Sequence, residues 1–178
     1  MLYQFLNIIL CFILTVSFSG CSENSGNNRK NKSKEADLKK SLLIANKSLV
    51  KKDDEKIRTY IARHNMTMQE SGTGLRYYIY GKGSGEKART GQRALVDYKL
   101  KLLDGTLCYS SKEKGPEEFM IGQDNVESGL HEGITYMKVG EKGVFILPPH
   151  LAHGLLGDEN KIPSRAILVY DIELLSLR

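Results

Sequence analysis

The sequence lacks tryptophan and has only four prolines and three cysteines in 178 residues. Cys11 and Cys21 belong to an apolar N-terminal stretch, so Cys108 has no partner in the rest of the chain for a disulfide. No spacing of cysteine and histidine is typical of a zinc site, and we expect neither a metal nor a cofactor. A chain of this length buries enough surface to fold without such cross-links.

Acidic and basic side chains are absent from residues 1–21, although the whole chain has a formal charge of +5. Residues 22–66 hold 12 basic and 6 acidic side chains, whereas residues 67–178 hold 14 basic and 15 acidic ones. A nucleic-acid-binding domain usually carries its basic patch on the folded body. Because the positive charge lies in the N-terminal arm instead, we expect no nucleic acid as a partner. The lysines of the arm suit either solvent exposure or a weak attraction to a membrane surface.

The N-terminal stretch is typical of a secretory signal. Residues 5–18 (FLNIILCFILTVSF) form an apolar run that is shorter than the ~20 residues of a membrane-spanning helix. The run ends in Phe18-Ser19-Gly20-Cys21, which resembles a bacterial lipobox, where the cysteine is lipidated and becomes the new N-terminus. The sequence thus predicts a signal peptide at 1–20, lipidation of Cys21, and a lipoprotein that faces the periplasm or is anchored to the outer membrane. An ordinary cleaved signal with an incidental cysteine is the alternative.

A polar segment and a helical pattern separate the signal from the body. Residues 21–35 are rich in Asn, Ser and Lys and predict a flexible tether behind the lipidated cysteine. Residues 36–66 predict a helical neck, because four apolar side chains recur with a helical period. These are Leu38, Leu42, Ala45 and Leu49. The acidic run 53–55 favours the start of a second short helix. Two interpretations stay open: a neck that forms a homodimer or cradles clients, and a helical hairpin packed on its own domain.

Residues 67–178 predict the main domain. Residues 93–103 (RALVDYKLKLL) alternate between apolar and polar side chains, as a strand with one buried face does, and Asp104-Gly105 predicts a hairpin turn after them. Further strands are predicted at 143–147 and 166–175, and a helix at 124–137. The fold class is therefore α+β: an antiparallel sheet wrapped around a short helix, preceded by an N-terminal helical segment.

Three stretches of this domain resemble the FKBP-type peptidyl-prolyl cis-trans isomerases. They are VDYKLKLLDGTLCYSS at 96–111, EFMIGQDNVESGLHEGITYMKVGEKGVFILPPHLAHG at 118–154 and IPSRAILVYDIELL at 162–175. A leader, a lipobox and a helical neck before such a domain are similar to the lipoprotein isomerases of Bacteroidetes-type bacteria, including those associated with gliding motility. The resemblance implies an isomerase that rotates the X–Pro bonds of proline-containing polypeptides and assists the folding of exported proteins at the cell envelope.

The same resemblance implies an apolar pocket for the proline ring. The positions that match the pocket of the family are Tyr98, Tyr109, Phe119, Val126, Glu127, Leu130, His153, Ile162 and Tyr170. Tyr170 stands where the family usually has phenylalanine. Without the resemblance, plain core packing would be the favoured interpretation of each apolar member of this set.

Besides Tyr170, four positions depart from the family pattern in ways that change the chemistry of the site. Cys108 and Tyr109 stand where the family has Phe and Asp, so an aspartate that commonly lines the site is absent. Glu117 and Glu127 replace apolar residues. Since a carboxylate near an apolar pocket needs solvent or a partner, both are expected at the rim. These departures leave a second hypothesis open: a catalytically weak binding or chaperone module in an envelope or motility assembly.

Overall fold

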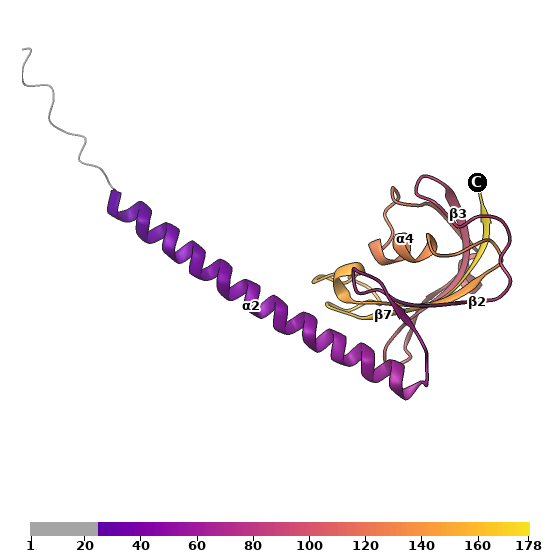
Figure 1. The fold of residues 1–178 in the computed structure, drawn as a ribbon, viewed down its shortest axis with the longest axis horizontal. Coiled ribbons are helices and arrows are strands. Elements are labelled where there is room, and N and C mark those ends of the chain that lie inside the picture. Colours follow the sequence, from indigo (N-terminus) through magenta and orange to yellow (C-terminus); the bar gives the residue numbers. More distant parts are fainter. Residues whose placement is uncertain (1–24) are drawn as a thin grey trace, which may run out of the picture. The chain divides into compact units, whose positions relative to one another are not determined.

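The computed structural model describes residues 25–178, so the expected signal peptide and Cys21 lie outside the described residues. The chain divides into two units, Met1–Lys47 and Ser48–Arg178. The second unit contains an antiparallel sheet and short helices (Figure 1). After α2 (Ser25–Arg63) the elements are β1 (Gln69–Glu70), β2 (Arg76–Tyr80), β3 (Arg93–Leu102), β4 (Leu107–Ser110), α3 (Ser111–Lys114), β5 (Glu117–Met120), α4 (Ser128–Ile134), β6 (Lys142–Leu147), the 3-10 helix η1 (Pro149–Leu151) and β7 (Leu168–Leu177).

α2 is one uninterrupted helix from Ser25 to Arg63, which differs from two of the expectations. The tether expected at 21–35 is helical from Ser25 onward. Asn, Ser and Gly are poor helix formers, but a helix that is already nucleated gains one further hydrogen bond per added residue. The helix also runs on through the acidic run 53–55. The preference of acidic residues for a helix start is worth only about 0.3–1 kcal/mol, and two of these carboxylates have partners elsewhere.

The sheet runs in the order β1-β2-β6-β7-β3-β4, with β5 also paired to β3, and every pairing is antiparallel. β3 is central to the arrangement, because β5 pairs with its first half, β4 pairs with its second half, and β7 follows its whole length. The expected hairpin after β3 is confirmed. Gly105 takes a φ of 90°, which glycine adopts without strain, and the N–H of Leu102 donates to the carbonyl of Thr106 at 3.0 Å.

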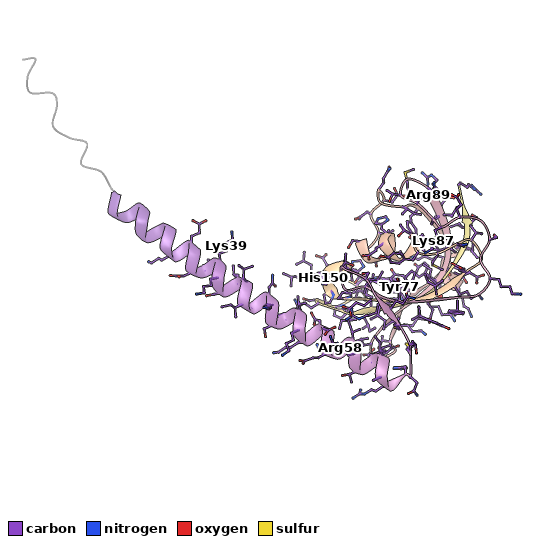
Figure 2. The ribbon with its side chains drawn as sticks, viewed as in Figure 1. Lys39, Arg58, Tyr77, Lys87, Arg89 and His150 are labelled. Carbon is purple, nitrogen blue, oxygen red and sulfur yellow. The ribbon has the colours of Figure 1, made fainter. Side chains whose placement is uncertain are left out.

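The main core lies between one face of the sheet and α4, which crosses that face in Figure 1. Because side chains alternate along a strand, Phe145 and Leu147 of β6 face this core, as does Tyr170 of β7. Tyr77 of β2 (Figure 2) stacks on Tyr136, with ring centroids 4.6 Å apart. The α+β fold expected from the sequence is thus present, with the sheet curved over one short helix.

A smaller core lies on the opposite face of the same sheet and contains the last turns of α2. Ile146 of β6 and Val169 of β7 face it, and Ile57 of α2 is only 1% exposed there. Two ion pairs join this end of α2 to the body. Asp53 pairs with Arg165 at 2.5 Å, and Asp54 with Arg76 at 2.6 Å. The end of the neck therefore packs on its own domain, as part of a single helix and not as a hairpin.

α4 is shorter than the helix predicted at 124–137. Asp124 uses its carboxylate to accept the N–H of Met120 at 2.7 Å and its carbonyl to accept the N–H of Val126 at 2.9 Å. These bonds form a turn, so the helix begins only at Ser128. None of the helices within residues 25–178 combines the length and the apolar character needed to cross a bilayer.

Candidate active site

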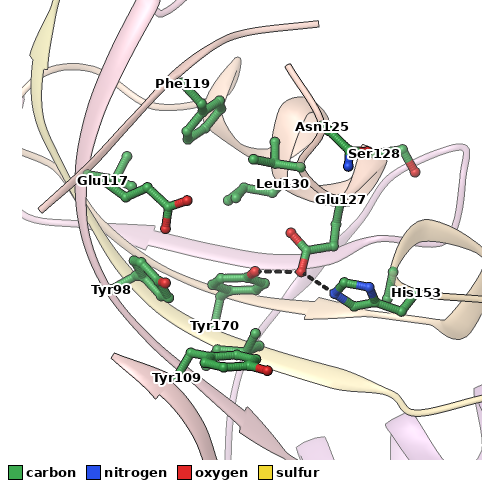
Figure 3. A pocket seen from close by; sticks show the side chains of 14 residues that line it. Tyr98, Tyr109, Glu117, Phe119, Asn125, Glu127, Ser128, Leu130, His153 and Tyr170 are labelled. Carbon is green, nitrogen blue, oxygen red and sulfur yellow. Dashed lines mark hydrogen bonds and ion pairs between the residues drawn. The ribbon is translucent and has the colours of Figure 1, made fainter. Parts of the chain in front are cut away.

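A cavity of about 480 Å³ opens beside α4, on the face of the sheet that carries the main core (Figure 3). Its volume falls in the range of small-ligand pockets, about 300–1,000 Å³. Fourteen residues line it: Val96, Tyr98, Leu100, Tyr109, Glu117, Phe119, Asn125, Val126, Glu127, Ser128, Leu130, Ala152, His153 and Tyr170.

Eight of the nine residues expected at the pocket line this cavity, and Ile162 does not. Ile162 was expected in the pocket wall but lies in the main core, 2% exposed. The physical reason lies in the loop before it, where a carboxylate oxygen of Asp158 accepts the N–H of Ile162 at 2.7 Å and so fixes the backbone with this side chain in the core. The expected pocket residues did not include Val96 and Leu100, which also line the cavity. Both could have been predicted, because they lie two positions before and after Tyr98 on one strand and therefore share its face.

Apolar side chains from four elements enclose the cavity: Leu130 of α4, Phe119 of β5, Tyr98 of β3 and Tyr170 of β7. The rings of Tyr98 and Tyr170 lie 5.9 Å apart and are tilted by 47°. Leu130, Phe119 and Tyr170 are buried in the main core, which holds them in place. The cavity therefore presents a preformed apolar surface on which a small ring can lie.

Glu127 lies inside the cavity, and the expectation that it sits at the rim is wrong. Its side chain is 10% exposed. One carboxylate oxygen, Oε1, accepts from the hydroxyl of Tyr170 at 2.8 Å and contacts Nε2 of His153 at 3.0 Å (Figure 3). The hydroxyl of Tyr170 makes the burial of the Glu127 carboxylate tolerable. A phenylalanine at position 170 would lack this donor. Burial, followed by the Glu127 charge, raises the pKa of Tyr170 well above its ordinary value, so the phenol stays a donor.

Glu117 occupies the mouth of the cavity and is exposed. Its carboxylate and that of Glu127 face each other across the cavity in Figure 3. Burial, and after it the Glu117 carboxylate, raises the pKa of Tyr98 far above its ordinary value. Tyr98 therefore stays protonated even at a pH above its ordinary pKa of 10.0.

Tyr109, which stands in place of the family aspartate, donates its hydroxyl to Asp158 in the loop after η1. Asp158 also accepts the N–H groups of Asn160 at 2.9 Å and Ile162 at 2.7 Å. Burial opposes the charge of Asp158, but these hydrogen bonds outweigh it and lower its pKa to about 2. Sequence reasoning missed Asp158, although an Asp followed two residues later by Asn in a loop is typical of a local turn.

The described residues offer binding groups rather than a reactive group at this site. Among residues 25–178, no three His, Cys, Asp or Glu side chains gather in a way that could hold a metal ion. Cys108 is buried in the main core, and burial raises the pKa of its thiol, which keeps it unreactive. The arrangement can bind an apolar ring on Leu130 and the aromatic side chains, with polar groups at its edge.

Comparisons with known proteins agree with this geometry. The model of a family described as FKBP-type peptidyl-prolyl cis-trans isomerase matches residues 84–175. FK506-binding protein 2 of Yarrowia lipolytica is 43% identical over 93 residues, which are 52% of this chain and 65% of that protein. The FKBP-type peptidyl-prolyl cis-trans isomerase FkpA of Aeromonas hydrophila is 37% identical over 128 residues, which are 71% of this chain and 46% of that protein. The chain thus spans less than two thirds of the length of these curated relatives.

Among solved structures, the crystal structure of FkpA from Escherichia coli is similar with a TM-score of 0.64 and 26% identity. The match covers 99% of this chain and 81% of that one. Family model, relatives and fold point to the same group of proteins.

Proposed function

Because this chain belongs to the family of FKBP-type peptidyl-prolyl cis-trans isomerases, we propose that it catalyses rotation about X–Pro bonds and assists the folding of exported proteins at the cell envelope. The observation that supports the activity is the single cavity in which Tyr98, Phe119, Leu130 and Tyr170 meet. Similarity to the bacterial FkpA proteins supports a bacterial isomerase of this class. The lipobox-like stretch that ends at Cys21 supports a lipoprotein of the Bacteroidetes type.

The cavity suits the physics of this reaction. Rotation about an X–Pro bond is slow because the amide must lose its partial double-bond character, a barrier of ~18–20 kcal/mol. A proline ring held on Leu130 between Tyr98 and Tyr170 would place its amide at an apolar, poorly hydrated surface. Such a surface disfavours the polar planar amide relative to the twisted one. The backbone N–H of Glu127, at the start of α4, is the donor that the family resemblance implies for holding the bound chain.

A refolding reaction limited by proline isomerisation tests this proposal with the full-length protein. Tyr98→Ala is expected to reduce the acceleration by roughly tenfold, because it removes one wall of the cavity. Tyr78→Ala is the matched control, since Tyr78 is 49% exposed on β2 and does not line the cavity. A Tyr98→Ala protein that is folded by circular dichroism and as active as the parent would refute the pocket assignment.

A second candidate function is a catalytically weak binding or chaperone module in an envelope or motility assembly. Tyr109 stands where the family commonly has an aspartate that lines the site, and its hydroxyl is bound to Asp158, which favours this function. The double variant Tyr109→Asp with Asp158→Asn restores the family carboxylate without bringing two carboxylates together. A large gain in isomerase rate would support the weak-module interpretation. An unchanged rate in a parent that already accelerates refolding would oppose it.

The lipid anchor is proposed from Cys21, and labelling of cells with a radioactive fatty acid tests it. Cys21→Ser is expected to abolish the label on the protein, because the thiol that would carry the lipid is lost. Cys11→Ser is the matched control, since it changes a cysteine in the same leader but not in the lipobox-like motif. If the parent takes up no label, or if Cys21→Ser keeps it, the lipidation proposal fails.

Dimerisation through α2 is proposed from its exposed apolar side chains within the first unit. Leu38, Leu42, Leu43 and Ile44 are each 59–63% exposed. Leu38 and Leu42 lie four positions apart and share one face of the helix. An exposed apolar face of this kind favours a second copy of the chain as its occupant. Light scattering of the parent protein is expected to give the mass of a dimer. The double variant Leu38→Glu with Leu42→Glu is expected to give the mass of a monomer. Leu155→Glu with Leu156→Glu, at exposed positions in the second unit, should leave the dimer intact.

A further inference from the structure

We propose that this pocket selects prolines that stand directly beside a lysine or an arginine. The inference rests on the proposed isomerase function and deepens it, because it names the class of polypeptide that the site takes. It depends on two carboxylates, those of Glu117 and Glu127, that line a cavity otherwise suited to an apolar ring.

Glu127 offers a carboxylate oxygen that is held in place and unused. Its side chain is nine-tenths buried, and Oε1 is fixed by Tyr170 and His153. No hydrogen bond from any residue within 25–178 reaches the other oxygen, Oε2, which points into the cavity in Figure 3. A lysine ammonium or an arginine guanidinium supplies both the missing donor and the compensating charge.

Glu117 adds a second negative charge across the same space. It comes from β5, opposite Glu127 at the start of α4. The two carboxylates act on the same aromatic walls: after burial, both contribute to the raised pKa values of Tyr98 and Tyr170. Both charges thus act on the two aromatic side chains between which a proline ring would lie.

The described residues place little positive charge against these two carboxylates. None of the fourteen lining residues is lysine or arginine, and His153 already contacts Glu127. The ammonium of Lys161 lies over the ring of Tyr109, 5.2 Å from its centroid. The cavity is thus negative where it opens, so a basic side chain of the client is attracted and an acidic one is repelled. An ion pair with partly exposed groups changes affinity by up to roughly fivefold, which sets the expected size of the preference.

The test compares peptides that differ only in charge. Acetylated Ala-Xaa-Pro-Phe and Ala-Pro-Xaa-Phe peptides carry lysine or N-acetyl-lysine at Xaa, so the stem of the side chain is kept. In at least one of the two positions, the full-length protein is expected to show roughly fivefold higher kcat/KM and tighter binding for lysine, with the ratio falling as salt is added. Glu117→Gln should bring the ratio of kcat/KM for the lysine peptide to kcat/KM for the N-acetyl-lysine peptide toward one. Glu118→Gln, the neighbour that bonds to Arg93 and does not line the cavity, should leave it unchanged.

Binding, measured by fluorescence anisotropy, separates this inference from the function on which it rests. Tighter binding of the lysine peptides without any acceleration would refute the isomerase proposal and support the preference. Acceleration with equal kcat/KM for lysine and N-acetyl-lysine in both positions would overturn the preference and leave the isomerase standing. A preference that Glu118→Gln reduces as much as Glu117→Gln would also overturn it, because the effect would then come from net charge and not from the cavity.

Discussion

The hydroxyl of Tyr170 is expected to stabilise the fold through the buried charge of Glu127. Tyr170→Phe keeps the ring, which is 3% exposed, and removes only the donor 2.8 Å from the Glu127 carboxylate. A hydrogen bond to a charged group is worth about 1.5–3 kcal/mol, more than a neutral one, because the charge is left undersolvated when the donor is lost. We therefore expect the free energy of unfolding to fall by about 2 kcal/mol.

A double-mutant cycle isolates the contribution of the charge. Glu127→Gln keeps an acceptor oxygen but no charge, so Tyr170→Phe in that background should cost only about 0.5–1.5 kcal/mol. The coupling energy between the two positions is then about 1 kcal/mol. Urea unfolding followed by circular dichroism measures it, and a loss of 2 kcal/mol corresponds to a midpoint lowered by about 1 M.

Tyr136→Phe is the matched control for this cycle. The hydroxyl of Tyr136 also donates to a carboxylate, that of Glu132 at 2.9 Å, but both side chains are only half-buried and lie outside the cavity. Water can replace that donor, so its loss should cost under about 1 kcal/mol. The reasoning is refuted if Tyr170→Phe costs no more than Tyr136→Phe, or if its cost is the same with Glu127 and with Gln at that position.

Three further variants test other contacts. Gly133→Ala should lower the free energy of unfolding by about 1–3 kcal/mol in urea unfolding, because the added Cβ would lie 2.6 Å from the buried ring of Phe145; a neutral result would show that α4 can move. Ile57→Ala should cost about 2–4 kcal/mol in the same assay, and a loss below about 1 kcal/mol would mean that the end of α2 does not pack as described. Asp158, held by Tyr109, has a folded-state pKa of about 2, below its ordinary 3.8. Its carboxylate therefore stabilises the fold at pH values above 3.8, and this contribution is lost as the pH falls toward 2. In urea unfolding at pH 6, Asp158→Asn should have a lower free energy of unfolding than the parent. The difference between the two proteins should be smaller at pH 2.5.

The strands could be predicted from the sequence because each carries its own local pattern. Alternation along β3 places Ala94, Val96 and Leu100 in the core as expected, and Asp104-Gly105 forms the predicted turn. Patterns of this kind depend only on which face of a strand is buried. The family motifs then locate most of the cavity, because they fix the order of the elements that surround it.

The errors arose where distant partners decide the outcome. The acidic residues at 53 and 54 resemble the start of a helix, yet they pair with Arg165 and Arg76, more than twenty positions away in the chain. From the sequence alone Glu127 is expected at the rim, because the hydroxyl that binds its buried carboxylate belongs to Tyr170, which is distant in the chain. Such pairs are formed by the folded chain and leave no trace in local periodicity, so sequence reasoning could not have found them.

The two cores on opposite faces of the sheet have a consequence for how the protein opens. In the second half of β6, Phe145 and Leu147 face one core while Ile146 faces the other, and all three are fully buried. At residues 145–147 of β6 and at their partners 168–170 of β7, neither face of the strand meets solvent. A local fluctuation cannot expose the amides there without separating both cores. Hydrogen exchange at these six residues should therefore report global unfolding alone. The pocket wall and the anchored end of α2 would then form one cooperative unit.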